Sequence, residues 1–133
     1  QSQQERERAV GKGVLGRVLW LALISLFHQY RTVWLETGGT PVPMVWLLIP
    51  ALALAVWMWR LNGRYLKEGG RSRALVVPDL LALACSFGLP YLLSALPGGW
   101  GILLSQLAAA VCLVGSVRAL RLHYGLPWSG RKG

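Results

Sequence analysis

The sequence predicts an all-α integral membrane protein with four transmembrane helices and with both termini in the cytoplasm. Composition is the first observation behind this prediction: hydrophobic residues make up 54% of the 133 residues and charged residues only 14%, against about 25% charged in soluble domains. The second is the presence of four apolar stretches of transmembrane length, at about residues 14–35, 43–59, 78–96 and 100–117. The third is the distribution of the basic residues.

The basic residues set the expected orientation. When the chain crosses the bilayer four times, every Lys and Arg except Arg31 falls on one side. Short loops rich in Lys and Arg stay in the cytoplasm. We therefore expect a cytoplasmic N-terminal tail over residues 1–13, a four-helix transmembrane domain over 14–121 and a basic cytoplasmic tail over 122–133. The expected compartment is a bacterial cytoplasmic (inner) membrane.

The net charge of +9 has two possible explanations, nucleic acid or lipid. The basic residues flank apolar spans and do not form one stripe with interleaved aromatic residues. The expected partner is therefore the bilayer with its anionic headgroups, and nucleic acid is not expected. The two cysteines, Cys85 and Cys112, both lie inside apolar stretches and show neither metal-ligand spacing nor a disulfide framework.

The first span has a strongly apolar core of only ten residues, from Val18 to Phe27. It reaches bilayer length only by including the more polar residues 28–34, which are tolerable near the membrane interface. Residues 1–12 are expected to form either a frayed tail or a short surface helix. A turn over residues 37–43, rich in Gly and Pro, follows the span.

The other three spans are bounded by Gly and Pro. Gly69 and Gly70 are expected to end a helical extension of the second span, and Pro78 is expected at the first position of the third helix. Residues 96–99 predict a tight turn before the fourth span, which extends towards His123. Within the spans, Pro50 and Pro90 predict bends, and Ser86, four residues before Pro90, is a local partner for the freed carbonyl.

Tryptophan placement supports the same topology. Trp concentrates at the headgroup level of membranes. Under this threading, Trp residues cluster at the ends of the spans: Trp34, Trp46 and Trp100 at the outer ends, and Trp57, Trp59 and Trp128 at or beyond the inner ends.

A polar patch on the first span is the main candidate for a binding site. Its residues follow the three- and four-residue steps of one helix face: Ser25, His28, Gln29, Thr32 and Glu36, with Arg31 on the flank. Intramembrane ionisable residues usually face a protein interior or a wet cavity. Three interpretations remain open: interfacial side chains with an Arg31–Glu36 ion pair, a contact with another subunit, or a small substrate site.

Asp79 is the only acidic residue in the apolar part of the other three spans. A proton- or cation-coupled carrier would use such a carboxylate. Its place after Pro78 favours helix capping, or pairing at the inner margin with Arg60, Arg64 or Arg73. His28 and His123 are expected on opposite sides, too far apart to ligate one haem between them. No cofactor and no metal site are expected.

The fourth span carries small residues at four-residue spacing, which allow close helix packing in lipid. Two such faces predict two packed neighbours. They are Ala108, Cys112 and Ser116, and Gly101, Ser105 and Ala109, with Gly115 adjoining. Cys85 and Cys112 are expected at equal distances from the inner ends of their spans. We therefore hypothesise that the third and fourth helices form an antiparallel hairpin in which the two thiols lie close together.

The sequence shows no nucleophile–base pair, metal cluster or phosphate-binding loop, so an enzyme is not expected. The leading hypothesis is a non-catalytic subunit or accessory protein of a larger membrane assembly, in contact with other membrane subunits or with itself. The alternatives are a small oligomeric transporter or channel, which would use residues 28–31 and Asp79, and a haem- or quinone-binding anchor of a redox complex.

Overall fold

The structure is a computed structural model and describes residues 3–38 and 44–125. The described part of the chain is entirely helical, with four helices long and apolar enough to span a membrane. Helix α1 runs over Gln3–Thr37, α2 over Leu48–Lys67, α3 over Ser72–Leu92 and α4 over Trp100–His123; a 3-10 turn, η1 (Met44–Leu47), leads into α2. The predicted all-α fold with four such helices is confirmed.

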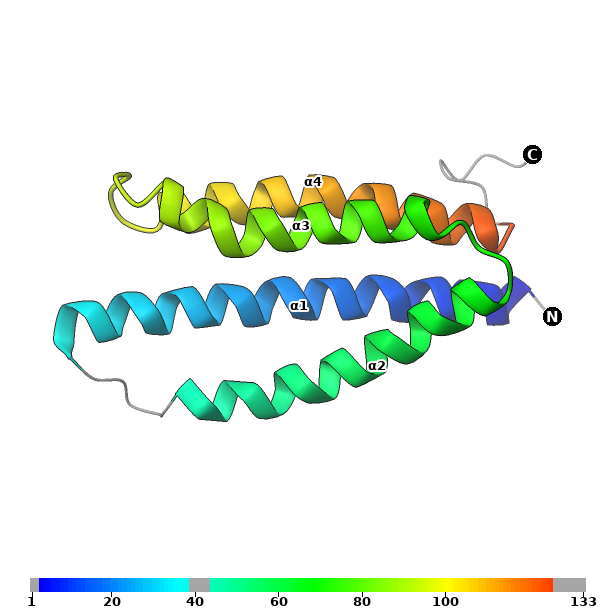
Figure 1. Cartoon of the computed structure of the whole chain (residues 1–133), viewed down its shortest axis with the longest axis horizontal. Helices are drawn as coiled ribbons and strands as arrows, with labels where there is room; N and C mark the ends of the chain where they lie inside the picture. Colours follow the sequence, from blue (N-terminus) through cyan, green and yellow to red (C-terminus); the bar gives the residue numbers. More distant parts are fainter. Residues whose placement is uncertain (1–2, 39–43, 126–133) are drawn as a thin grey trace.

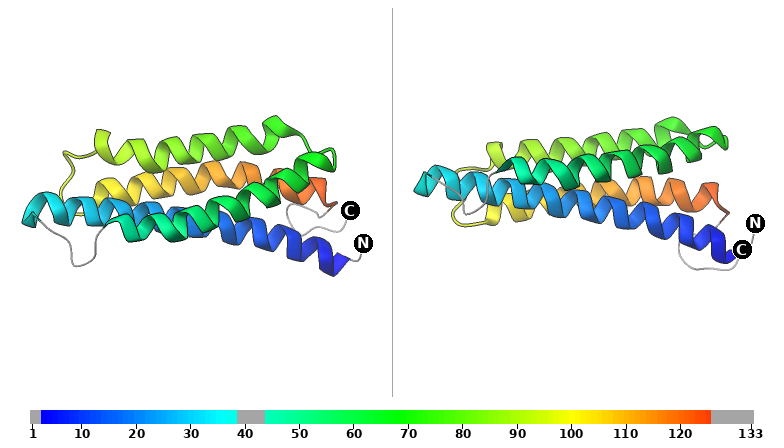
Figure 2. Two further views of the ribbon diagram at one scale, coloured as in Figure 1. Left: turned by 60° about the horizontal axis from the view of Figure 1, so that its bottom comes forward. Right: turned by 90° about the horizontal axis from the view of Figure 1, so that it is seen from below.

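The helices run antiparallel in chain order (Figure 1), so α1 begins and α4 ends at the same end of the bundle. We call this the terminal end and the opposite one the far end. Helices α3 and α4 pack closely along their length, and α1 packs against α2, α3 and α4. Helix α2 packs chiefly against α1; it meets α3 and α4 through Tyr65 at the terminal end and diverges from them towards the far end (Figure 1), and Figure 2 gives two further views.

Helix α1 is longer than the span that the sequence predicts. Its 35 residues extend about 52 Å at 1.5 Å per residue, whereas the hydrocarbon core of a bilayer is about 30 Å thick. Residues 3–13, expected as a tail or a separate surface helix, continue the same helix. One residue from each helix holds this end together in a buried apolar cluster: Val10, Tyr65, Leu75 and Leu120.

The start of α3 corrects the prediction made from Pro78. The helix begins at Ser72, so Pro78 lies inside it, as Pro90 does. Leu75, only 1% exposed, packs in the buried cluster and stabilises the turns before Pro78. The hydroxyl of Tyr65 donates a hydrogen bond of 3.0 Å to the Arg71 carbonyl and fixes the preceding loop. Helix α3 also ends earlier than predicted, at Leu92.

The other boundaries follow the glycines. Helix α2 ends at Lys67, and Gly69 adopts a positive φ of +88° in the loop, which confirms the predicted end of the second helix. Gly98 also adopts a positive φ, of +62°, in the turn between α3 and α4. Pro50 is only the third residue of α2, where a missing N–H costs little, so the predicted bend at this position has no physical cause. Of the predicted turn 37–43, residues 39–43 lie outside the described part.

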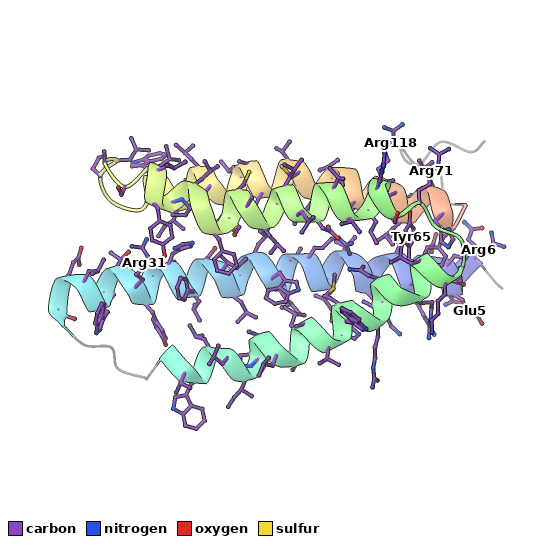
Figure 3. The ribbon with its side chains drawn as sticks, in the orientation of Figure 1. Glu5, Arg6, Arg31, Tyr65, Arg71 and Arg118 are labelled. Atoms are coloured by element: carbon purple, nitrogen blue, oxygen red, sulfur yellow. The ribbon has the colours of Figure 1, made fainter. Side chains whose placement is uncertain are left out.

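Charge is segregated along the bundle. Figure 3 shows Arg6, Arg71 and Arg118 at the terminal end and Arg31 near the far end. The exposed Trp34, at the end of α1, and Trp100, at the start of α4, also belong to the far end. Trp128, Arg131 and Lys132 lie outside the described residues.

Candidate functional site

The most deeply buried charged group is Arg17 of α1, which is 3% exposed. It forms a bidentate ion pair with Asp79 of α3: Nη2 donates to Oδ2 at 2.8 Å and Nε to Oδ1 at 3.1 Å. The same Nε lies 3.0 Å from the Ser116 hydroxyl of α4, and Nη1 donates to the Gly13 carbonyl at 2.9 Å. One side chain therefore connects α1, α3 and α4.

Asp79 is thus paired, as its position led us to expect, but not with Arg60, Arg64 or Arg73 and not as a helix cap. It is the eighth residue of α3, about 10 Å along the helix. Arg17 precedes the apolar core of the first span, so the sequence alone places it with the other basic residues of the cytoplasmic flank, whereas the structure buries it in the bundle. Bidentate guanidinium–carboxylate bonds are among the strongest charge-assisted hydrogen bonds, and they neutralise both charges within the bundle.

A second polar cluster lies towards the far end, around His28. This side chain is fully buried, with Nε2 at 3.0 Å from the backbone carbonyl of Ser86. Since a carbonyl oxygen can only accept, Nε2 carries the proton and donates. Pro90 has no N–H to bond this carbonyl four residues before it. The freed Ser86 carbonyl therefore finds its partner on α1, while the Ser86 hydroxyl donates to Gln106 Oε1 of α4 at 3.1 Å.

Three buried polar atoms of this cluster have no hydrogen-bond partner in the structure: His28 Nδ1, Arg31 Nε and Gln106 Nε2. The guanidinium of Arg31 lies over the ring of Tyr91 of α3, 4.4 Å from its centroid. Such a cation–π contact stabilises a cation but leaves its hydrogen-bonding groups unused. The polar groups of this cluster are thus less completely paired than those around Arg17.

The polar patch predicted on the first span is divided by the structure. His28 and Arg31 face α3, whereas Gln29 and Glu36 are exposed and Ser25 is only partly buried. Thr32, also exposed, donates from its hydroxyl to the His28 carbonyl at 2.9 Å. Among the described residues no ion pair joins Arg31 to Glu36, one of the three interpretations left open; the Arg31 guanidinium contacts the ring of Tyr91.

The small residues of α4 face two neighbours, as predicted. Ser105, Ala109 and Ser116 are buried, with Ser116 against Arg17 of α1. Gly101 and Gly115 allow close approach of α3: a Cβ at Gly101 would lie 2.8 Å from the Leu93 carbonyl, and one at Gly115 would lie 3.1 Å from the Pro78 ring. Ala108 and Cys112 are partly buried.

The α3–α4 hairpin brings the two cysteines together. Cys85 and Cys112 are free thiols, both partly buried, and their side chains are close enough to interact. The hypothesis of an antiparallel hairpin with adjacent thiols is therefore confirmed.

His123 lies at the terminal end, remote from His28. Its ring packs edge-on against Tyr65 and Tyr124, and its Nε2 is 3.9 Å from Glu68 Oε1. Burial raises the pKa of Tyr124, and the adjacent Glu68 carboxylate, which accepts its hydrogen bond at 3.4 Å, raises it further. Within residues 3–38 and 44–125 no three His, Cys, Asp or Glu side chains gather as a metal site.

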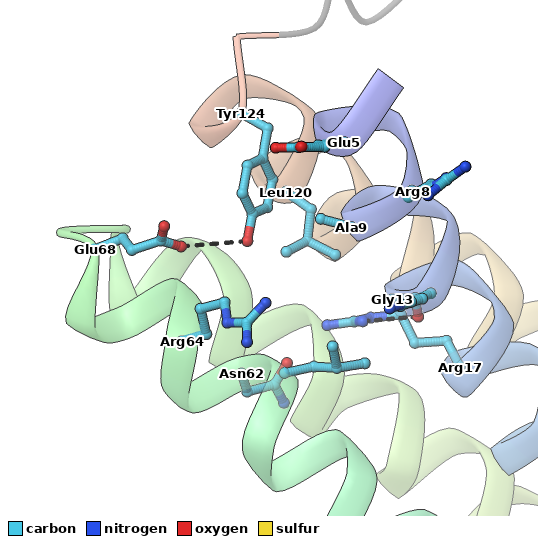
Figure 4. Close-up of a pocket in the computed structure, with 12 residues that line it drawn as sticks. Glu5, Arg8, Ala9, Gly13, Arg17, Asn62, Arg64, Glu68, Leu120 and Tyr124 are labelled. Carbon is cyan, nitrogen blue, oxygen red and sulfur yellow. Dashed lines mark hydrogen bonds between the residues drawn. The ribbon is translucent and has the colours of Figure 1, made fainter. Parts of the chain in front are cut away.

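Three cavities follow α1 in order from the terminal end. The terminal pocket, about 310 Å³, lies between residues 5–17, 61–68 and 120–124; Figure 4 shows its walls. The middle groove, about 250 Å³, lies between residues 17–24, 55–62 and 79–83. The far groove, about 340 Å³, lies between residues 20–27 and 45–51 and is lined by apolar side chains.

Comparisons with protein-family models, with curated proteins and with solved structures give no significant match.

Proposed function

We propose that this chain is a non-catalytic subunit or accessory protein of a larger membrane assembly, in a bacterial inner membrane with both termini in the cytoplasm. The observation that carries the proposal is Arg31. It is partly buried, rests on Tyr91, and has a buried Nε without a hydrogen-bond partner. An ionisable side chain at membrane depth is normally paired. An acceptor from a neighbouring subunit, a carboxylate or a backbone carbonyl, binds the part of the guanidinium that this chain leaves exposed.

The buried ion pair supports a structural role over transport. A coupling carboxylate must gain and lose a proton or cation during each cycle. Both carboxylate oxygens of Asp79 accept a hydrogen bond from Arg17, so a coupled ion would have to displace the guanidinium in every cycle. The pair also fixes α1 against α3 and α4, whereas alternating access requires groups of helices to move relative to one another.

His28 gives the redox-anchor alternative little support. Its Nε2 is bonded to the Ser86 carbonyl, and its ring is enclosed by Phe27, Phe87 and Tyr91 at centroid distances of 5.4, 6.3 and 5.8 Å. Ligation of a haem would require that hydrogen bond to break and those rings to separate.

The test is purification of the tagged full chain in mild detergent, followed by native mass spectrometry. We expect a stoichiometric complex with other membrane subunits, or a defined oligomer of this chain. Arg31→Gln should reduce recovery of the complex about tenfold or more, since one charged group left unpaired at an interface costs at least about 2 kcal/mol. Gln29→Ala, an exposed polar residue of the same stretch, is the matched control.

Two outcomes would contradict the proposal. One is a stable wild-type monomer under conditions that preserve other membrane complexes. The other is equal recovery from Arg31→Gln and Gln29→Ala.

A further inference from the structure

The cavities along α1 adjoin one another in a row, which we call the path, from a basic pocket to an apolar groove. The terminal pocket and the middle groove share Arg17 and Asn62 as lining residues, and the middle and far grooves share Trp20 and Ile24. From Arg17 to Phe27 the path follows ten residues of α1, about 15 Å. This is about the hydrocarbon depth of one leaflet of a bilayer.

The path changes chemically along its length. The terminal pocket is lined by four basic residues, Arg8, Lys12, Arg17 and Arg64, and by two acidic ones, Glu5 and Glu68. The two grooves are lined chiefly by Leu, Ile, Ala, Trp and Phe. The middle groove is also lined by Arg17, Asn62 and Asp79, and its other walls are apolar. Basic at one end and chiefly apolar along the rest, the path has the polarity of a phospholipid molecule.

The walls of the terminal pocket suit an anion. Arg64 of α2 points into the pocket towards α1, where Arg17 lies on the other wall (Figure 4). Arg17 uses Nε and one N–H from each terminal nitrogen in its bonds to Asp79, Ser116 and Gly13. A guanidinium has five N–H donors, so two remain, on a side chain that lines the pocket.

The position of α2 keeps the path open sideways. Helix α2 contacts α3 and α4 at the terminal end through Tyr65 and otherwise packs chiefly against α1, so the middle groove runs between α2 and α3 with α1 as its floor. A lipid chain can enter such a groove from the bilayer without any helix separating. Basic pockets between transmembrane helices at the membrane surface are the kind of site that binds anionic headgroups.

We propose that this path is a binding site for one anionic phospholipid of the leaflet at the terminal end. Its phosphate binds in the terminal pocket between Lys12 and Arg64, beside Arg17, and one acyl chain follows α1 through the middle groove past Trp20. This site is distinct from the contact at Arg31 and does not depend on it.

The test uses the purified full chain and native mass spectrometry with two lipids of equal chain length, phosphatidylglycerol and phosphatidylcholine. We expect one phosphatidylglycerol to bind per chain, at least tenfold more tightly than phosphatidylcholine. Arg64→Gln should weaken it about fivefold, which corresponds to the about 1 kcal/mol that a basic side chain contributes to anionic-lipid binding. Lys12→Gln should act similarly.

Two controls separate this site from general attraction to a basic surface. Arg118→Gln removes one exposed positive charge at the same end of the bundle and should change binding less than twofold. Ala55→Trp fills the middle groove from α2 and should weaken binding of phosphatidylglycerol without changing the pocket. Circular dichroism verifies that each variant is folded.

Three results would overturn the proposal: equal affinity for the two lipids, equal loss from Arg64→Gln and Arg118→Gln, or unchanged binding in Ala55→Trp. Inorganic phosphate is the probe for the headgroup alone. If it displaces the lipid completely at millimolar concentration, the pocket binds an anion but the groove holds no chain. If a transmembrane helix of another protein is found crosslinked in the groove in place of lipid, the assignment is also wrong.

Discussion

Arg17 and His28 lie on one helix, and each bonds a group that the sequence places far away. Arg17 reaches Asp79, 62 positions later, and Ser116, 99 positions later; His28 reaches the Ser86 carbonyl, 58 positions later. These three bonds satisfy polar groups that lipid cannot hydrate. Arg17 and His28 therefore have a structural role, which is to connect α1 to α3 and α4.

Replacement of Asp79 tests this directly. Asp79→Asn leaves the Arg17 charge buried without a counter-charge, so we expect the free energy of unfolding to fall by about 3 kcal/mol or more. Thermal unfolding in detergent, followed by circular dichroism, measures the loss. Glu36→Gln removes an exposed carboxylate and should change stability by less than about 0.5 kcal/mol.

The double variant Arg17→Met/Asp79→Leu sharpens the same test. Replacing both ions of a buried pair by apolar side chains is often neutral, so the double variant should be more stable than Asp79→Asn. If the double variant is the less stable of the two, Arg17 has important contacts beyond the ion pair.

For individual residues, the sequence predicted which polar side chains take part in contacts within the bundle better than it predicted their partners. Asp79 was expected to be paired, and His28 was expected in a polar patch. Helical spacing shows which residues share a face, but not how far that face is turned towards the neighbouring helices. Gln29 and His28 are adjacent in sequence, yet one is exposed and the other fully buried. Long-range pairs such as Arg17–Asp79 leave no local pattern.

Among the elements, α3 and α4 form the most closely packed pair, and Gly101 lies where their ends come closest. Gly101→Ala would place a methyl group 2.8 Å from the Leu93 backbone carbonyl, so we expect a loss of about 1–3 kcal/mol in the free energy of unfolding. Gly88→Ala is the matched control on α3, because nothing lies within 4 Å of its Cβ position. It should stabilise the helix by up to about 1 kcal/mol. Equal effects of the two substitutions on thermal unfolding would contradict the packing at Gly101.

The thiols of the same hairpin give a second prediction. Because the side chains of Cys85 and Cys112 lie close together and these are the only cysteines of the chain, a short bifunctional thiol reagent should join them within one chain. Intact-mass measurement then shows one linker and no remaining free thiol. Cys85→Ser must abolish the product; a product that is mainly a crosslinked dimer would disagree with the hairpin.

The sequence predicted the existence and order of the helices because each is long, apolar and bounded by Gly or Pro. It failed at Pro78 for a physical reason. Pro at a first helical position is a good general expectation, but Leu75 is buried against Tyr65 and Val10, and this long-range packing extends α3 to Ser72. Residues 3–13 were likewise expected as a tail, and the burial of Val10 in the same cluster holds them in α1.

For the whole molecule, an even number of crossings places the start of α1 and the end of α4 at one end of the bundle (Figure 1). Basic residues of α1, α2, α3 and α4 accumulate there, whereas Arg31 lies towards the far end. Under the positive-inside rule we expect this end in the cytoplasm. Tags placed at the two ends of the chain should both be protected from a membrane-impermeant reagent in intact cells and both react after lysis. Labelling of only one tag in intact cells would refute the four-crossing topology.

The Arg17 contacts have a consequence for biogenesis. If helices leave the translocon in chain order, α1 and α2 enter the lipid while Asp79 and Ser116 are still being synthesised, 62 and 99 residues behind Arg17. During that interval the guanidinium lacks its counter-ion and has to remain near the hydrated surface or within the insertion machinery. Once α3 is inserted, Asp79 pairs with the guanidinium and Arg17 can enter the bundle. Packing of α1 in its final position therefore depends on synthesis of the second half of the chain.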